Sequence, residues 1–339
     1  MKARLYRHED ERDLLRLASV AMPGWVRLRY DYASGYAAAE ALKGDCEMVV
    51  VEDAEGRIAG CGTRSTRLLY LDGEPQKVGY LSGLRSFTGP RGGFGFYRGL
   101  MKLRELEDAN PNELTFTTIL DNNADGRALL TSGRAGLPKY IPCGKVVTVA
   151  LHGASGAAPE RATTEELAEF YARISPRRQL FPIFGTGLPS GMSEKDFFVV
   201  RRAGRIAAAA AVWNHGERRR IVVDGYSIVL SAMRPALNAL SSFSHCPRLP
   251  RPGDEFACSY LAYALADDND PVLFAELLEA ARRMCRGRNL VLSLHSDDPL
   301  LRTVHAFGGW KYSSEFFTVE FGQRKREFRG VPYVEAGAL

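Results

Sequence analysis

Long apolar runs, clustered cysteines and an excess of one charge are all missing from this sequence of 339 residues. No apolar run reaches the roughly 18–20 residues that a membrane-spanning helix needs. The start, MKARLYRHEDERD, carries charges where a signal peptide has its apolar stretch. We therefore expect a cytoplasmic protein with no membrane partner.

The cysteines and the charges exclude further classes of protein. The six cysteines stand far apart, with no C-x-x-C pair and no histidine at ligand spacing, which argues against a zinc site and a disulfide framework. Residues 1–151 hold 21 Lys and Arg against 19 Asp and Glu, and the rest hold 24 against 21, so the net charge of +5 is evenly spread. A nucleic-acid-binding protein concentrates basic residues on one face. We expect neither a metal nor a nucleic acid partner.

The length and the apolar content, by contrast, suffice for two packed domains. Hydrophobic residues make up 45% of the chain and charged residues 25%. Small residues and Pro159 interrupt the hydrophobic pattern before Thr164 opens a helix with Thr-Glu-Glu. We place domains at residues 1–151 and 164–322, a linker at 152–163 and a tail at 323–339. The tail ends in VPYVEAGAL, whose near-alternating apolar residues predict an extended segment packed across the domains.

The order of elements in the first half returns in the second. Both halves contain a hairpin spelled Gly-Arg-Ile-Ala, at Gly56–Ala59 and Gly204–Ala207. Both also contain a strand with Tyr-Leu, at Tyr80-Leu81 and Tyr260-Leu261, followed by helix, strand and helix patterns. We infer an internal duplication with a period of about 180 residues, and we expect the halves to share one fold.

One loop carries a chemical signal. The sequence TGPRGGFG lies between the strand KVGYLSGLRS and the helix FYRGLMKLRELED. Backbone N–H groups at a helix N-terminus bind phosphate, and glycines let a pyrophosphate approach them. The loop fits neither the P-loop pattern nor a dinucleotide-binding G-x-G-x-x-G. A tight strand-to-helix turn is the alternative interpretation.

The succession of strand, helices, antiparallel three-stranded meander, glycine loop, helix, strand, helix and strand resembles the GNAT acetyltransferase superfamily in both halves. Gly93 and Gly95 match the two glycines of that family's loop, while Pro90 stands where the family has Gln or Arg. The resemblance implies a mixed-sheet α/β fold of two tandem GNAT-like domains, each a mostly antiparallel twisted sheet flanked by helices. Motif support is confined to about residues 78–137.

The resemblance also implies acetyl-CoA, or another acyl-CoA, as cosubstrate. In the family, the end of the strand before the loop binds the pantetheine arm, the loop holds the pyrophosphate, and a polar residue after the next strand often contacts the cofactor. Carried over, the cofactor-binding candidates are Leu84, Arg85 and Ser86 on the strand, Arg91, Gly92, Gly93, Phe94, Gly95 and Phe96 in the loop, and Asn122 or Asn123 after the next strand. A helix cap is the alternative role for the asparagines.

The second half has lost the glycine loop. It spells ADDNDPVL where the first half spells TGPRGGFG, and three aspartates there would repel a pyrophosphate. We therefore expect a degenerate C-terminal copy that does not bind CoA and serves as a packing partner or substrate wall.

The usual catalytic acid of the family is absent. A tyrosine in the helix after the next strand normally has this role, and here its position falls on Leu130 or Ser132, depending on the direction of counting. Ser132, and Tyr140 a few residues later, are the remaining candidates. No general base stands out.

The resemblance implies an acyl-CoA-dependent N-acyltransferase, with acetyl-CoA the expected donor and a small-molecule or peptide amine the acceptor. A non-catalytic acyl-CoA-binding or scaffold protein is one alternative, which the missing tyrosine favours. An aminoacyl or peptidyl transferase of the tandem-GNAT type is another, against which the even charge speaks. A homodimer is left open.

Overall fold

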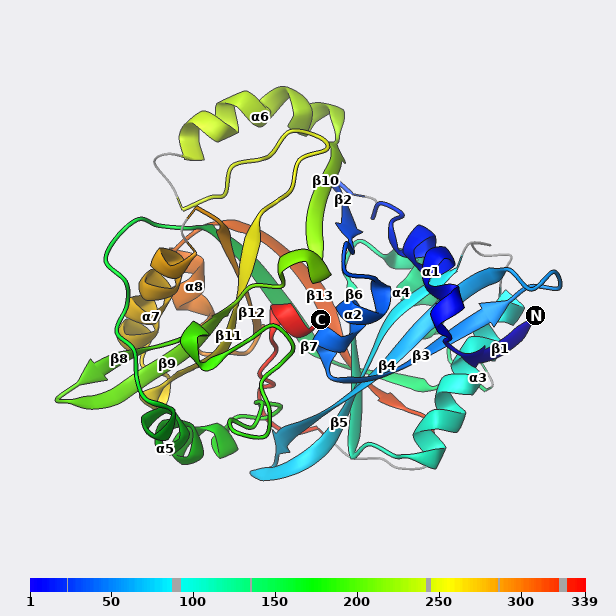
Figure 1. Cartoon of the computed structure of the whole chain (residues 1–339), viewed down its shortest axis with the longest axis horizontal. Helices are drawn as coiled ribbons and strands as arrows, with labels where there is room; N and C mark the ends of the chain where they lie inside the picture. The colour runs from blue at the N-terminus through cyan, green and yellow to red at the C-terminus, as the bar shows by residue number, and fades with distance from the viewer. Residues whose placement is uncertain (23, 87–92, 135, 242–244, 286, 323–327) are drawn as a thin grey trace.

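Strands from both halves of the sequence join in one mixed sheet of 11 strands (Figure 1), in the order β1-β3-β4-β5-β6-β13-β7-β12-β11-β9-β8. The structure is a computed structural model that describes every residue except 23, 87–92, 135, 242–244, 286 and 323–327. A two-stranded ribbon, β10-β2, stands outside this sheet. The mixed α/β sheet confirms the predicted fold class.

The first half forms an antiparallel meander followed by alternating helices and strands. Its two hairpin turns place Gly56 and Gly73 at positive φ, 78° and 86°, where a side chain would be strained. The elements in chain order are β1 (Lys2–Leu5), α1 (Glu11–Ala18), β2 (Val26–Asp31), α2 (Tyr36–Glu40), β3 (Asp45–Glu52), β4 (Ile58–Leu71), β5 (Glu74–Ser86), α3 (Gly93–Ala109), β6 (Leu114–Leu120), α4 (Ala124–Leu130) and β7 (Lys139–His152).

The second half repeats this plan. Its first helix begins where the sequence predicts, because Thr163 and Glu166 exchange side-chain to backbone hydrogen bonds in a capping box. Its first hairpin turns at Gly204, whose φ of 78° equals that of Gly56. The elements are α5 (Thr164–Ile174), β8 (Phe197–Arg202), β9 (Arg205–Trp213), β10 (Arg220–Tyr226), α6 (Ile228–Leu240), β11 (Cys258–Ala266), α7 (Pro271–Met284), β12 (Asn289–His295), α8 (Leu301–Ala306) and β13 (Trp310–Glu320).

The two halves exchange their last strands. β6 of the first half pairs antiparallel with β13, which closes the second half, and β12 pairs antiparallel with β7, which closes the first. β7 and β13 also pair with each other at the centre of the sheet. The sheet therefore runs without a break from one half to the other, and the domain boundaries at residues 151 and 164 stay a prediction.

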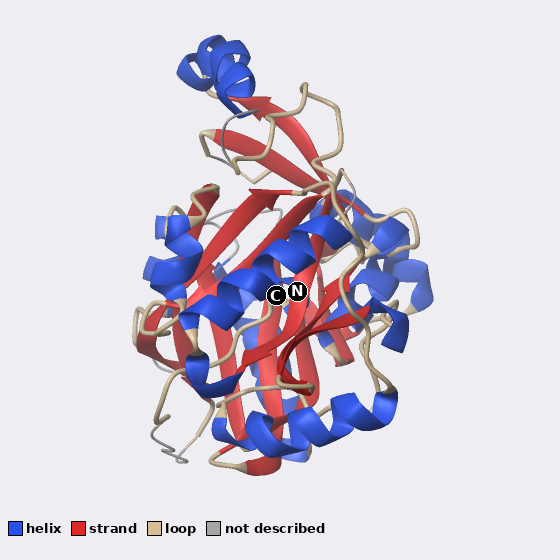
Figure 2. Cartoon of the chain, turned by 90° about the vertical axis from the view of Figure 1, so that its left-hand side faces the viewer, coloured by secondary structure: helices blue, strands red, loops and turns tan. Residues whose placement is uncertain are grey.

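Helices cover both faces of the sheet (Figure 2). Apolar side chains of α3 and α4 pack on one face in the first half, and those of α7 and α8 pack on the corresponding face in the second. The other face carries α1 and α2 in the first half and α5 in the second. Apolar residues that recur at helical spacing on these helices thus face the sheet from two sides.

The C-terminal tail lies on the same face as α1, α2 and α5. Val334 packs with first-half residues such as Leu69 and Val78, whereas Tyr333 and Ala336 pack with α5 and β11. Tyr333 also donates its backbone N–H to the carbonyl of Gln179. The tail therefore crosses both halves, as its alternating apolar residues predicted.

The β2–β10 ribbon carries α6 away from the body of the molecule (Figures 1 and 2). No residue of α6 is buried, and Ile228 at its start is 90% exposed. Among the described residues, no helix is long and apolar enough to cross a membrane. All six cysteines are free thiols.

Candidate functional site

Two parallel strands at the centre of the first half separate after three residue pairs. β5 and β6 pair from Val78 opposite Leu114 to Tyr80 opposite Phe116. β5 then continues to Ser86 and β6 to Leu120 without pairing to each other. The strands therefore splay, and within the described residues this end of β5 has a strand neighbour on its β4 side alone.

A β-bulge lies at the splayed end of β5. Ser82 pairs with Thr63 and Arg85 with Cys61, so Gly83 and Leu84 together oppose the single residue Gly62. Gly83 has a φ of 63°, and a Cβ there would lie 2.9 Å from the Tyr36 hydroxyl. A Cβ on Gly62 would lie 2.7 Å from the Leu84 side chain. The bulge is thus closely packed at both glycines, and at Gly83 the positive φ also disfavours a side chain.

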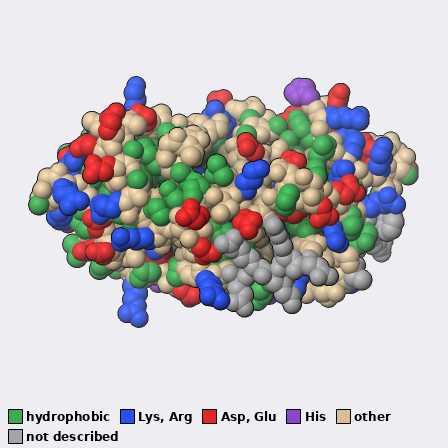
Figure 3. All heavy atoms as spheres, turned by 90° about the horizontal axis from the view of Figure 1, so that it is seen from below, with side chains coloured by type: hydrophobic (Ala, Val, Ile, Leu, Met, Phe, Trp, Pro, Cys, Tyr) green, Lys and Arg blue, Asp and Glu red, His purple; other side chains and the backbone are tan. Residues whose placement is uncertain are grey.

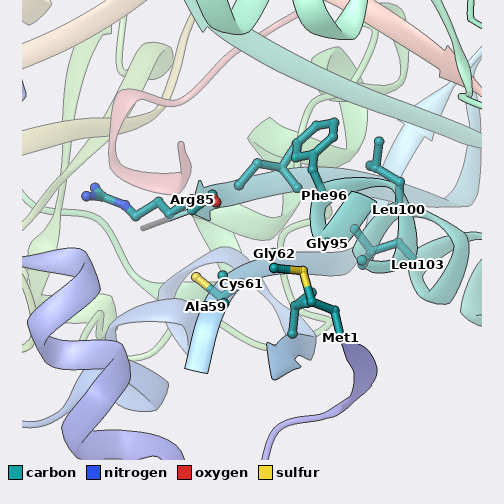
Figure 4. A pocket seen from close by; sticks show the side chains of 14 residues that line it. Met1, Ala59, Cys61, Gly62, Arg85, Gly95, Phe96, Leu100 and Leu103 are labelled. Carbon is teal, nitrogen blue, oxygen red and sulfur yellow. The ribbon is translucent and has the colours of Figure 1, made fainter. Parts of the chain in front are cut away.

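A pocket adjoins this bulge on the α3 face of the sheet (Figure 4). Its cavity volume is only about 20 Å³, roughly the room of one water molecule. Met1 packs closely here, because a Cβ on Gly95 would lie 2.5 Å from the Met1 sulfur. Figure 4 shows the Arg85 side chain extending away from the apolar lining. Apart from Arg85, Ser86 and Cys61, the lining is glycine and apolar: Met1, Val51, Ala59, Gly60, Gly62, Leu84, Gly95, Phe96, Gly99, Leu100 and Leu103.

Polar side chains from α2 and the turn after it approach the other face of the bulge. The Lys43 ammonium donates to Glu40 Oε1 at 2.6 Å and to the Ser82 hydroxyl at 3.0 Å. Cys61 Sγ donates to the carbonyl oxygen of Gly83 at 3.3 Å. Sequence reasoning did not select Glu40 or Lys43, because nothing in YAAAEALKGD marks it as more than a short helix.

The second half repeats the splay and the bulge at equivalent residues. β11 and β12 also pair in parallel over three residues, ending at Tyr260 opposite Val291. Tyr263 and Ala264 then oppose one residue of β9, as Gly83 and Leu84 do in the first half. The Tyr80 and Tyr260 pair that the sequence comparison aligned thus marks the same point in both halves.

These features agree with comparisons to solved structures. No family model and no curated protein matches the sequence. The chain is similar to a GCN5-related glucosamine N-acetyltransferase region of a fungal multi-domain GH3 β-N-acetylglucosaminidase, with a TM-score of 0.62 and 13% identity, covering 94% of this chain and 38% of that one. It is similar to Saccharomyces cerevisiae N-myristoyltransferase with bound myristoyl-CoA, with a TM-score of 0.57 and 11% identity, covering 94% and 79%.

A third similar structure is a GCN5-related N-acetyltransferase from Anabaena variabilis, with a TM-score of 0.51 and 7% identity, covering 95% of this chain and 73% of that one. The chain has a tandem GNAT fold. Identities this low establish the fold and leave the activity to be argued from the site.

Within this tandem GNAT fold, several of the residues predicted to bind the cofactor meet at one place. Leu84, Arg85, Ser86, Gly95 and Phe96 line the pocket beside the bulge. Gly93 and Phe94 lie in the first turn of α3, while Arg91 and Gly92 lie outside the described residues. Their role in cofactor binding stays a prediction.

The asparagines lie apart from this pocket. Asn123 caps α4, where its side-chain oxygen accepts the Gly126 N–H at 3.1 Å. The Asn122 amide instead approaches Gly24, where a Cβ would lie 3.3 Å away from it. The helix cap is the geometry observed for Asn123, and neither residue lines the pocket.

The two candidate acids of the tandem GNAT fold differ in burial. Ser132 is exposed in the turn after α4. Tyr140 is buried in the apolar cluster of Leu100 and Leu103, and its hydroxyl has no hydrogen-bond partner among the described residues. Burial raises the pKa of Tyr140 above its usual value. Its phenol therefore stays neutral, and no polar group holds it toward the bulge.

Proposed function

We propose that this protein is an acyl-CoA-dependent N-acyltransferase and that its N-terminal half holds the acyl-CoA. The observation that carries the proposal is the splayed, bulged end of β5, which leads to the N-terminus of α3. Residues 82–85 of β5 are partly exposed there, whereas residues 78–81 before them are buried. The first turn of α3 contains no acidic residue, which leaves its N–H groups favourable for an anion.

The acyl group in this proposal is acetyl. The pocket beside the bulge is apolar, but Met1 packs against Gly95 there and leaves a cavity of only about 20 Å³. A long chain would require Met1 to move. The comparison proteins include one with bound myristoyl-CoA and one described as a glucosamine N-acetyltransferase region, so donor length is an experimental variable.

The acceptor in this proposal is a primary amine on a small molecule or peptide. It would approach from the α2 face of the sheet, opposite the pocket, where Tyr36 and Glu40 lie next to Gly83. Both side chains are buried, so α2 would have to move aside to admit the acceptor. A charged tRNA as acyl source gains no support from the face shown in Figure 3, where acidic and basic side chains are interspersed among the described residues.

Turnover of acyl-CoA with amines tests the proposal. Thiol release from acetyl-CoA, octanoyl-CoA and myristoyl-CoA is measured with glucosamine, spermidine, tyramine and the dipeptide Gly-Gly. Calorimetry with CoA gives binding independently. We expect saturable CoA binding and thiol release that depends on both the amine and acetyl-CoA. Absence of CoA binding would overturn the assignment of the N-terminal half.

A non-catalytic acyl-CoA-binding protein is the second candidate, and the position of Tyr140 favours it. Helix α4 contains no tyrosine, and the Tyr140 hydroxyl is enclosed by apolar side chains. CoA binding without thiol release for any amine in the panel would support this candidate over the enzyme.

A further inference from the structure

A buried carboxylate with one unpaired oxygen lies beside the bulge. Glu40 is 3% exposed, and its Oε1 is held by the Lys43 ammonium at 2.6 Å. Its Oε2 is enclosed and has no hydrogen-bond partner among the described residues. A buried acceptor left unpaired costs on the order of 1–3 kcal/mol, more when it is charged. A purely structural ion pair does not account for this cost.

The unpaired oxygen is directed at the bulge. A Cβ built on Gly83 would lie 3.7 Å from Glu40 Oε2 and 2.9 Å from the Tyr36 hydroxyl. Lys43 binds Ser82, the residue before Gly83, and so fixes the carboxylate against this strand. The free oxygen thus lies on the α2 face of the bulge. The Leu84 side chain of the same bulge borders the pocket on the α3 face.

We propose that Glu40 binds the ammonium group of the acceptor and removes its proton. This inference rests on the proposed N-acyltransferase function and names its acceptor-binding residue. The ligand class is a primary ammonium, because a carboxylate that presents one free oxygen pairs with a cationic donor. Lys43 acts as a positioning residue that occupies the other oxygen.

The proton balance of the step is complete. One proton of the ammonium passes to Glu40 Oε2, and the neutral amine nitrogen then forms a bond to the thioester carbonyl carbon. The carbon–sulfur bond breaks, and the second nitrogen proton leaves with the thiolate to give the thiol. Glu40 releases its proton to solvent when the amide product departs.

Other titratable groups around Glu40 do not compete for this role near neutral pH. Burial raises the pKa of Cys46 to about 11 and of Cys61 and Tyr80 to about 12, and it also raises the pKa of Tyr32 and Tyr36. Lys43 contacts Glu40 directly. The other groups within electrostatic range of the Glu40 carboxylate come from several elements: Tyr36 from α2, Tyr32 from the loop after β2, Cys46 from β3, Cys61 from β4, Tyr80 from β5, and Arg219 from the turn before β10. The thiols and phenols therefore stay neutral below about pH 9.

The first experiment is Glu40→Gln, assayed with acetyl-CoA and the fastest amine of the panel. We expect kcat/KM for the amine to fall about 10²–10³-fold, with an unchanged KM for acetyl-CoA. Glu105→Gln is the matched control, because Glu105 forms a surface i,i+3 pair with Lys102. We expect that control to leave the rate unchanged.

A second variant separates catalysis from folding. Glu40→Gln combined with Lys43→Met removes both buried charges, and replacing a buried ion pair by neutral groups is often neutral for stability. We expect this double variant to unfold near the wild-type temperature and to remain as slow as Glu40→Gln. Recovery to within about threefold of the wild-type rate would show that Glu40 has only a structural role and would overturn the proposal.

A binding measurement distinguishes this inference from the proposed function. Each panel amine is titrated calorimetrically into the enzyme saturated with CoA, which has no acyl group to transfer. We expect Glu40→Gln to weaken binding of the tightest-binding amine by about 10–100-fold. That loss without any wild-type turnover would retain the ammonium site and reject the acyltransferase. Turnover and amine binding that are both insensitive to Glu40→Gln, or no amine binding to the wild type, would overturn the ammonium site.

Discussion

The two splayed strand pairs of this molecule share a backbone and differ in what fills them. In the first half, the bulge residue is Gly83, and β5 is partly exposed from Ser82 to Arg85. In the second half, the equivalent residue is Tyr263, which keeps a positive φ of 52° although it is not glycine, and every residue of β11 is buried. The second half thus keeps the backbone conformation of the first bulge, but side chains fill the space around it.

The tail occupies the backbone groups of the second bulge. The Tyr263 N–H donates to Glu335 at 3.0 Å, and the Ala264 N–H donates to the Tyr333 hydroxyl at 3.0 Å. Ser293 on β12 donates to the Val334 carbonyl, so the tail bridges the two splayed strands. Hydrogen bonds that a ligand would need in this half are thus made within the chain.

The helix that follows each bulge also differs between the halves: α7 has a carboxylate at its N-terminus, and α3 has none in its first turn. Asp270 caps α7, where its carboxylate accepts the N–H groups of Val272 and Leu273. That carboxylate stands where an anionic ligand would bind, whereas the first turn of α3 contains no acid. We therefore expect a ligand to bind in the first half, where the bulge residue is glycine and the helix start carries no acid, and not in the second.

The largest expected effect comes from giving the first bulge the residue of the second. Gly83→Tyr places at position 83 the tyrosine that the second half has at position 263. We expect CoA affinity to fall at least about 100-fold, because the new side chain would meet the Tyr36 hydroxyl and strain the backbone. Calorimetry measures it, with Gly204→Tyr as the control, since Gly204 also has positive φ and open space around its Cβ. Equal affinity in both variants would place the cofactor elsewhere.

The converse substitution, Tyr263→Gly, tests the bulge of the second half. Tyr263→Gly removes a ring that is 1% exposed and relieves a left-handed backbone. We expect the free energy of unfolding to fall by about 2–4 kcal/mol, the cost of a large cavity less the relieved strain, with CoA affinity unchanged. Denaturant titration and calorimetry measure the two. A binding stoichiometry of two CoA molecules per chain would mean that Tyr263 alone had closed a second site.

Acid should lower the free energy of unfolding through His215, which lies in the second half. Its ring stacks on Tyr260 at 4.3 Å, it is 2% exposed, and neither ring nitrogen has a hydrogen-bond partner among the described residues. Burial, with Arg219 and Arg218 nearby, lowers the pKa of His215 to about 2. Below the ordinary histidine pKa of about 6.5, His215 is protonated in the unfolded chain but stays neutral in the folded chain. The free energy of unfolding therefore falls as the pH falls.

Between pH 7 and pH 5 this linkage should cost about 2 kcal/mol. Denaturant titrations at both pH values measure it. His215→Phe keeps an aromatic ring against Tyr260 and should remove about this much of the pH dependence, while CoA affinity stays the same. An unchanged pH dependence in the variant would show that acid acts at other groups.

Features that depend on neighbouring residues were predictable from the sequence, and features that depend on distant pairing were not. The helix start at Thr164 and the equivalence of Tyr80 and Tyr260 follow from local patterns of capping and hydrophobic residues. The exchange of β7 and β13 does not, because either strand satisfies the same alternating pattern in either half. Only tertiary structure chooses between them.

The candidate site divides in the same way. Leu84, Arg85 and Gly95 are candidates because the family resemblance carries its cofactor-binding residues onto this strand end and glycine loop, and they line one pocket. Glu40 was missed because its significance comes from Gly83, which lies 43 residues farther along the chain. The contacts of Glu335 and Tyr333 with the second bulge were missed for the same reason, although the tail itself was expected to pack across the domains.

The smallest expected effect is at Tyr140. The sequence leaves this residue as a candidate acid, since the family position falls on Leu130 or Ser132. Its hydroxyl is buried and has no hydrogen-bond partner in the described part of the chain, and its ring lies edge-on to Phe317 at 6.2 Å within an apolar cluster. Tyr140→Phe removes only this unpaired hydroxyl, so we expect the free energy of unfolding to stay the same or to rise by up to about 1 kcal/mol.

For the same reason we expect Tyr140→Phe to change the rate of acyl transfer by less than about threefold, because a thiol of ordinary pKa near 8.5 leaves without much help from an acid. Steady-state kinetics with acetyl-CoA measures the rate, and denaturant titration measures the stability. A fall of about 10²-fold or more at unchanged CoA affinity would instead assign Tyr140 as the acid. The first half would then need to open between α3 and β7 during turnover, because the hydroxyl is enclosed in this structure.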